Sequence, residues 1–161
     1  MSNIHFYNVR TKKHEFCNMK EWVLMHTQSI AALMITTCKL INAPVAFSLY
    51  GADGDGYVVA DDESFSNPFT MAHEEGHLEL GHYLPGANVR VDEHGIIDDN
   101  DAEKAADEYA IKKTRDPRSA LVSLQRYMEQ IDETKFPSKE KYVKCRLDLT
   151  ERMLHIANLK L

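Results

Sequence analysis

One stretch of this chain, Asn67-Pro-Phe-Thr-Met-Ala-His-Glu-Glu-Gly-His-Leu-Glu-Leu-Gly-His82, carries its clearest structural pattern. Asn67 is a favourable N-cap for a helix, and Pro68 suits the first helical position. We therefore predict a helix over residues 68–82, in which Gly76 would let another element approach closely. An apolar stripe on this helix faces the core and flanks two histidines. Its members are Phe69, Ala72, Gly76 and Leu80.

The centre of this helix, His73-Glu-Glu-Gly-His77, predicts a metal site. Two histidines four residues apart lie one above the other on a helix face, so both imidazoles can reach one cation. Glu74 lies about 100° round the helix from His73. There it can act as general base toward a metal-bound water that attacks a carbonyl. Glu75 and Glu79 fall on the far side, where we expect them to face water.

A catalytic zinc with one open position needs a third protein ligand. If the first helix continues to residue 82, His82 points nearly opposite His73, and we reject it as a ligand. Glu103 is the better candidate, at the start of a helix predicted over residues 101–114. Lys104, Glu108 and Lys112 turn outward on this helix, and the other face carries Glu103, Ala106, Asp107 and Ala110.

The face that carries Glu103 supports a ligand role. Its small alanines would let the helix pack tightly, and Asp107, one turn further on, would orient a ligand histidine from behind. A second interpretation is also open, because Asn100 followed by Glu103 matches an N-terminal capping box. Taken together with His73 and His77, the pattern favours the ligand interpretation.

These motifs resemble the gluzincin zinc metallopeptidases, in which His-Glu-x-x-His is followed some 25 residues later by Glu-x-x-Ala-Asp. Residues 69–82 are similar to the ImmA/IrrE group, whose zinc helix usually reads Phe-Thr-x-Ala-His-Glu-Leu-Gly-His with Leu-Gly-His after it. Glu75 replaces the usual apolar residue. The segments Ala102–Asp107, Asp116–Ala120 and Thr150–Met153 look more like the HtpX-like group. The resemblance covers roughly residues 65–125 and leaves the natural substrate open.

The resemblance implies a minimal soluble zincin with zinc held by His73, His77 and Glu103, and Glu74 as the catalytic base. It also implies that the strand before the zinc helix, Tyr57–Ala60, aligns the substrate backbone. Such sites usually add a donor for the developing oxyanion. The candidates are Arg152, from the HtpX-like resemblance, and then His155, Tyr83 and His94.

The composition is that of one compact domain over residues 1–161, with 43% hydrophobic and 27% charged residues. A net charge of −6 argues against a nucleic-acid-binding surface. The longest apolar run, Ile30 to Ile35, is far too short to cross a bilayer, so we expect no membrane partner. Three widely spaced cysteines and an N-terminus without an apolar secretory core favour reduced thiols and a cytoplasmic location.

The remaining pattern predicts an α+β protein, with helices around a small sheet that packs on the zinc helix. Apolar positions at helical spacing, including Trp22, Met25 and Leu33, indicate a long N-terminal helix. Two β-rich runs around a glycine-rich turn indicate a hairpin. The predicted elements are a strand over 3–10, a helix over 15–41, a hairpin over 44–61, and C-terminal helices over 117–159 with a break near Phe136.

We therefore predict zinc-dependent hydrolysis of peptide bonds in a cytosolic protein or peptide, with the metal-bound water activated by Glu74. Two histidines and one carboxylate also bind Fe(II) in oxygenases, but the helical context and Glu74 favour zinc. One alternative is a non-catalytic zinc-binding regulatory or interaction module, against which the intact Glu74 argues. Another is a latent enzyme whose C-terminal helix covers the cleft, as in the pro-forms of minimal gluzincins by resemblance. The bond cleaved and the oligomeric state stay open.

Overall fold

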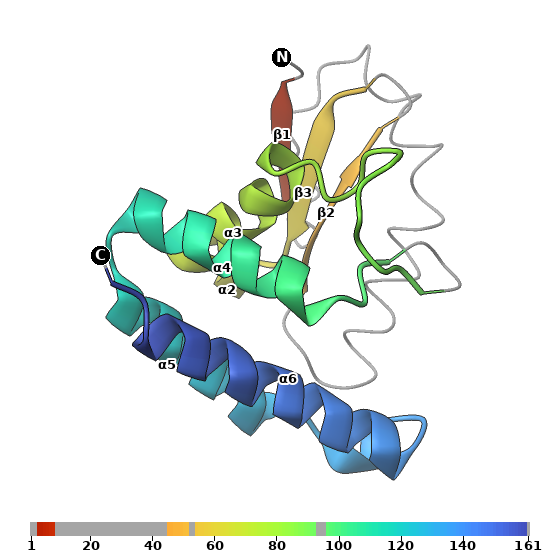
Figure 1. Cartoon of the computed structure of the whole chain (residues 1–161), viewed down its shortest axis with the longest axis vertical. Coiled ribbons are helices and arrows are strands. Elements are labelled where there is room, and N and C mark those ends of the chain that lie inside the picture. The colour runs from red at the N-terminus through yellow and green to blue at the C-terminus, as the bar shows by residue number, and fades with distance from the viewer. Residues whose placement is uncertain (1–2, 9–44, 52–53, 93–95, 161) are drawn as a thin grey trace.

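The computed structural model describes residues 3–8, 45–51, 54–92 and 96–160 (Figure 1). In this part of the chain, five α-helices and a three-stranded mixed sheet form an α+β fold, as the sequence predicts. The helix expected over residues 15–41 and the candidate His94 lie outside the described residues. None of the described helices combines the length and the apolar character needed to cross a membrane.

The sheet has the strand order β1-β3-β2. β1 (Ile4–Asn8) runs parallel to β3 (Gly56–Ala60), and β2 (Ala46–Tyr50) runs antiparallel to β3. The predicted hairpin over residues 44–61 is therefore present as β2 and β3. All five residues of β3 are buried, and this strand is hydrogen-bonded to a neighbour along each edge.

The assignment of Tyr57–Ala60 as the substrate-aligning strand is wrong. This segment belongs to β3, which has a hydrogen-bonded neighbour on each side. An extended peptide adds only to an edge strand, where backbone groups are still unpaired. In the described part of the sheet the edges are β1 and β2. Of these, β2 packs against the helix that carries the two histidines, where Tyr50 Oη donates a hydrogen bond to the Leu78 carbonyl at 2.7 Å.

That helix, α3 (Pro68–Glu79), begins as predicted, with the Asn67 side chain capping its first turn. It ends at Glu79 and does not continue to residue 82. Leu80 is the C-cap, and Gly81 has a φ of +71°, a left-handed conformation that favours glycine and ends the helix. Leu80 is consequently 48% exposed and does not belong to the buried stripe.

The second site helix, α4 (Asn100–Thr114), is capped by Asp99 and not by Asn100. The Asp99 carboxylate accepts hydrogen bonds from two backbone N–H groups of the first turn. The Asn100 side chain donates instead to α6 (Lys139–Ala157), to the Asp148 carbonyl and the Glu151 carboxylate. The capping-box interpretation is therefore wrong, and Glu103 is available for another role.

α3 and α4 pack closely because small residues meet at their contact. A Cβ atom at Gly76 of α3 would lie 2.9 Å from Cδ1 of Tyr109 and 3.3 Å from the Ala106 carbonyl oxygen. Ala102, Ala106 and Ala110 of α4 are buried. The predicted close approach at Gly76 is thus confirmed, and it sets the spacing between the two helices that carry the site.

Two helices, α5 (Pro117–Gln130) and α6, form a layer on the side of α4 away from the sheet (Figure 1). The short helix α2 (Asp62–Phe65) joins the sheet to α3. α5 and α6 pack against each other, with the 3-10 helix η2 (Glu133–Lys135) between them near the predicted break. The core that they share with α3 and α4 contains Phe69, Ala72, Ala110, Ile111, Ala120, Leu124, Met128, Ile131, Leu149 and Ile156.

Candidate metal centre

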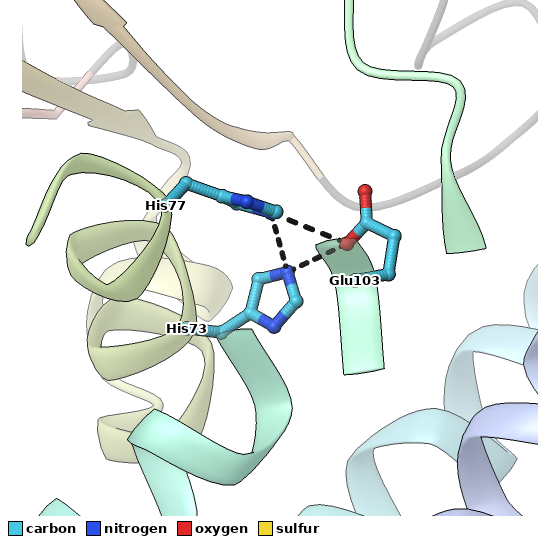
Figure 2. Close-up of side chains that lie close together, drawn as sticks. All are labelled: His73, His77 and Glu103. Carbon is cyan, nitrogen blue, oxygen red and sulfur yellow. Dashed lines mark hydrogen bonds and ion pairs between the residues drawn. The ribbon is translucent and has the colours of Figure 1, made fainter. Parts of the chain in front are cut away.

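Three side chains from two helices converge on one point (Figure 2). His73 and His77 come from α3, and Glu103 comes from α4. Nε2 of His73 lies 3.1 Å from Nε2 of His77. Oε2 of Glu103 lies 2.9 Å from the first of these nitrogens and 3.2 Å from the second. The fold therefore brings the three predicted ligands together, and we call them the triad.

The triad fits a divalent cation. Its three ligand atoms all lie within 4.8 Å of one another. Zinc binds imidazole nitrogen and carboxylate oxygen at roughly 2.0–2.2 Å, a distance that suits a cation seated over a triangle of this size. His73 and His77 are buried, whereas the Glu103 side chain is 25% exposed. The triad can thus hold a metal ion, and this donor set suits zinc or iron.

His73 is held from behind by a carboxylate and a guanidinium. Asp107 Oδ1 lies 2.8 Å from Nδ1 of His73. Arg152 donates from Nε to Oδ2 of Asp107 at 2.8 Å and from Nη2 to Oδ1 at 2.7 Å. A carboxylate in this position fixes which ring nitrogen carries the proton, so that Nε2 is left to face the triad. Asp107 therefore lies where the predicted orienting role requires it.

Arg152, a candidate donor to the oxyanion, comes from α6 and is engaged by Asp107. Its Nη1 atom lies 3.9 Å from Oε2 of Glu103, and 14% of its side chain is exposed. The guanidinium thus faces two acids at the site. A direct contact with a reacting oxygen stays a prediction.

Charges at the site shift three pKa values. Burial opposes ionisation of Asp107, but the charge and hydrogen bonds of Arg152 hold the pKa of this carboxyl below its usual value. Burial also opposes ionisation of Glu103, but hydrogen bonds from His73 and His77 hold its pKa well below the usual value. Burial acts to lower the pKa of His73, yet Asp107 and Glu103 outweigh it and raise this pKa to about 10. A proton on His73 and a metal ion at its Nε2 atom would therefore compete.

Glu74 lies in the same cleft as the triad. The cleft has a volume of about 1090 Å³ and is lined by residues of α3, α4, α5 and α6, including His73, Glu74 and Glu103. Glu74 is only 8% exposed. Among the residues that the structure describes, its carboxylate has no hydrogen-bond or ion-pair partner. A carboxylate that is not engaged elsewhere can accept a proton from a group bound in the cleft.

The turn after α3 places His82 in a different position from the one expected for a helix that continues to residue 82. Because α3 ends at Glu79, His82 folds back onto His77, and their Nδ1 atoms lie 2.8 Å apart. His82 does not belong to the triad. Our rejection of it as a ligand agrees with this, but the reason, a continuing helix, is wrong. Gly81, a residue type common at the end of a helix, is the sequence signal that indicates this turn.

Tyr83 follows in the same turn and lies close to the site. Its ring centroid is 6.0 Å from that of His77, and its hydroxyl accepts a hydrogen bond from Ser48 Oγ at 3.2 Å. Burial and the nearby charge of Glu74 raise the pKa of Tyr83, so the hydroxyl keeps its proton. Its role as an oxyanion donor stays a prediction.

Two other residues of the prediction, Glu75 and His155, each pair with a charged residue of α4. Glu75 does not face water: its Oε2 atom accepts a hydrogen bond from the Tyr109 hydroxyl at 3.0 Å and pairs with Lys113, and its side chain is only 15% exposed. The second position, His155, has its Nε2 atom 3.4 Å from Oε2 of Glu108, a half-exposed residue of α4. This histidine lies outside the triad.

Comparisons with known proteins add no relative: the chain matches no family model, no curated protein and no solved structure. The resemblance to gluzincins therefore rests on the two motifs and on their convergence in space. The structure supports the coarser part of that resemblance, a His73-x-x-x-His77 pair with Glu103 in a group compact enough for one metal ion.

Proposed function

We propose that this protein is a zinc-dependent peptidase of gluzincin type that hydrolyses peptide bonds in a protein or peptide. The observation that carries the proposal is the position of Glu74, a buried carboxylate next to His73 that shares the cleft with the triad. A metal that only stabilises a fold does not require such a group. A general base must lie within reach of the proton that it abstracts. The place of Glu74 in the cleft, on the helix that supplies two ligands, supports this role.

In this proposal, different residues bind the metal, orient its ligands and transfer the proton. His73, His77 and Glu103 would hold the metal, and Asp107 with Arg152 keeps the His73 ring in place. When bound, zinc supplies a Lewis acid that polarises the scissile carbonyl and lowers the pKa of a coordinated water. Glu74 takes the proton of the attacking water and passes it to the leaving amine nitrogen.

The cleft supports a peptide rather than a small metabolite as substrate. Its volume of about 1090 Å³ is slightly above the roughly 300–1,000 Å³ that is usual for small-molecule sites. Its lining reaches from His73 and Glu103 to residues of α5 and α6, an extent that favours a chain of several residues.

Glu74→Gln tests the proposal. The change keeps the size and hydrogen-bonding capacity of the side chain but removes its basicity, while the triad is untouched. We expect normal zinc content, a normal melting temperature, and a loss of roughly 10²–10⁴ in cleavage rate, as is typical when a general base is removed. Glu79→Gln is the matched control, because Glu79 is an exposed glutamate of the same helix. It should cleave like the parent.

The assay uses zinc-loaded protein and a diverse peptide mixture read by mass spectrometry, so that cleavage of many different sequences can be detected. Cleavage by the parent and by Glu79→Gln, with none by Glu74→Gln, supports the peptidase. Equal cleavage by Glu74→Gln would remove Glu74 from the mechanism. Zinc binding without cleavage of any peptide by the parent would favour a regulatory or interaction module.

A further inference from the structure

The buried imidazole of His77 has two nitrogens, and each faces a different group. Its Nε2 atom lies 3.1 Å from Nε2 of His73 and 3.2 Å from Oε2 of Glu103, at the place where the triad would hold a metal. Its Nδ1 atom lies 2.8 Å from Nδ1 of His82. His77 is only 2% exposed, so water does not readily replace this contact.

The direction of the His77–His82 hydrogen bond follows from the metal site. A neutral imidazole carries one N–H and one lone pair. If the lone pair of His77 Nε2 faces a cation, its proton is on Nδ1 and must be donated. His82 then accepts at its own Nδ1 atom and carries its proton on Nε2.

The backbone holds His82 in this place. The positive φ of Gly81 turns the chain back at the end of α3. The His82 backbone N–H then donates to the His77 carbonyl at 3.0 Å. The two rings meet at 62° with their centroids 5.1 Å apart, which directs the edge of His82 toward His77.

We propose that His82 is a positioning residue that accepts a hydrogen bond from Nδ1–H of His77 and thereby aims Nε2 of His77 at the metal. The proposal rests on the proposed function only in requiring that the triad holds a metal. Asp107 supplies the same kind of contact to His73, so both ligand histidines are held from behind. His82 differs in being a neutral acceptor, which orients its ligand without adding a second carboxylate charge near the cation.

Three substitutions of His82 separate positioning from simple packing. Asn has an oxygen near the place of Nδ1 and restores an acceptor, Asp restores a charged acceptor, and Leu fills space without any acceptor. The probe is Zn²⁺, added to metal-free protein in competition with a chelator of known affinity. We expect His82→Leu to bind Zn²⁺ roughly 10–100-fold more weakly, as is usual when a partner of a metal ligand is lost. His82→Asn and His82→Asp should stay within a few-fold of the parent.

Two further measurements make the outcome decisive. Nitrogen NMR of the zinc-loaded parent should show His77 protonated on Nδ1 and His82 protonated on Nε2, which is informative even if His82→Leu does not fold. His155→Leu is the control histidine outside the triad and should leave Zn²⁺ affinity unchanged.

Parent affinity in His82→Leu, or a His82→Asn variant as weak as His82→Leu, would overturn the positioning role. A His82 protonated on Nδ1 in the parent would overturn it as well. These results differ from failure of the proposed function. A parent that bound Zn²⁺ but cleaved no peptide would overturn the peptidase and leave the positioning role of His82 intact, whereas a parent that bound no Zn²⁺ would overturn both.

Discussion

The imidazole of His73 is held by groups from two further helices. Asp107 and Glu103 reach it from α4, and Arg152 reaches Asp107 from α6. Positive and negative groups alternate along this chain of contacts: the Arg152 guanidinium, the Asp107 carboxylate, the His73 imidazole and the Glu103 carboxylate. Each charge therefore has a partner of opposite sign. Removing one member of a buried pair typically costs about 3–5 kcal/mol, because the other charge is left unpaired. The same contacts that stabilise the fold therefore aim the His73 ring.

His73→Ala should abolish stoichiometric zinc binding, because it removes a ligand from the triad while Asp107 and Arg152 can still pair. We expect the parent to hold about one zinc per chain, since three ligands of this type bind zinc tightly at neutral pH. Zinc content after dialysis is measured by atomic emission, and unfolding by calorimetry with and without added zinc. Bound zinc should stabilise the parent by about 4 kcal/mol when free zinc exceeds Kd a thousandfold.

His155→Ala is the control for this experiment and should keep both its zinc and the stabilisation by zinc. Full zinc retention by His73→Ala would contradict the triad. Glu103→Ala should also weaken binding. If it does not, another acid supplies the third ligand.

The site depends on how the two helices α3 and α4 pack against each other. Gly76 lets the helices approach, and Glu75 joins them by accepting a hydrogen bond from Tyr109 and pairing with Lys113. Two of the triad's ligands are on one helix and the third is on the other. A shift between these helices would therefore change the distances that a cation needs.

The parent should lose stability as the pH becomes alkaline, and Glu75→Gln should show this loss at a lower pH than the parent does. Burial and the hydrogen bond to Glu75 raise the pKa of Tyr109 to about 12, above the roughly 10 of an unfolded chain. The protonated form is thus favoured by folding, and its contribution is complete below pH 10 and lost as pH rises to 12. Without the Glu75 charge, the pKa of Tyr109 should fall toward 10. The pKa of Tyr109 is measured from phenolate absorbance, as the difference between a protein with Tyr109 and the same protein with Tyr109→Phe. The stability is measured as Tm against pH.

Glu129→Gln, a change on the exposed side of α5, should leave the Tyr109 titration as in the parent. An unchanged titration in Glu75→Gln would show that Glu75 does not control the ionisation of Tyr109.

Features that depend on spacing within one helix could be predicted from the sequence. His73, Glu74 and His77 are related by helical geometry alone, and Glu103 and Asp107 are one turn apart on a helix with small contact residues. For these residues the helical spacing gives the correct face of the helix. The structure brings His73, His77 and Glu103 together. The hairpin was also predictable, because its two strands are joined by a local turn.

Features that depend on contacts between distant segments could not be predicted in this way. The parallel pairing of β1 with β3 makes β3 a central strand, and no local pattern encodes it. Glu75 is polar, so the wheel alone assigns it to solvent, whereas its partners lie on α4. The prediction for His82 fails for a different reason: a helix over residues 68–82 places Gly81 in its interior, whereas the positive φ of Gly81 ends the helix.

Over the whole molecule, α6 is part of the core and not a separable cover. It contributes Leu149 and Ile156, which are 4% and 2% exposed, and it places Arg152 on Asp107. Burial of each aliphatic side chain contributes about 1.5–3 kcal/mol, and a buried carboxylate left without its partner costs about 3–5 kcal/mol. These amounts approach the roughly 5–15 kcal/mol by which a whole domain is stable.

Truncation after Ser138 should therefore destroy cooperative unfolding and should not release activity. Circular dichroism melting and the peptide-mixture assay measure the two properties on the same preparation. Leu147→Ser is the control, because Leu147 is on α6 but 59% exposed, and it should melt and cleave like the parent. A truncated protein that stays folded and cleaves faster would indicate that α6 holds the enzyme in a latent form.

The sheet supplies none of the triad's three ligands, and this has a consequence for the order of events in folding. Closing the triad brings together His77 and Glu103, which are 26 residues apart. Pairing β1 with β3 brings Ile4 to Gly56, twice that separation. Each doubling of a loop adds about 0.6 kcal/mol to the entropic cost of closure. We expect the two helices to meet before the first strand docks, so that a cation captured at this stage would act as an early cross-link.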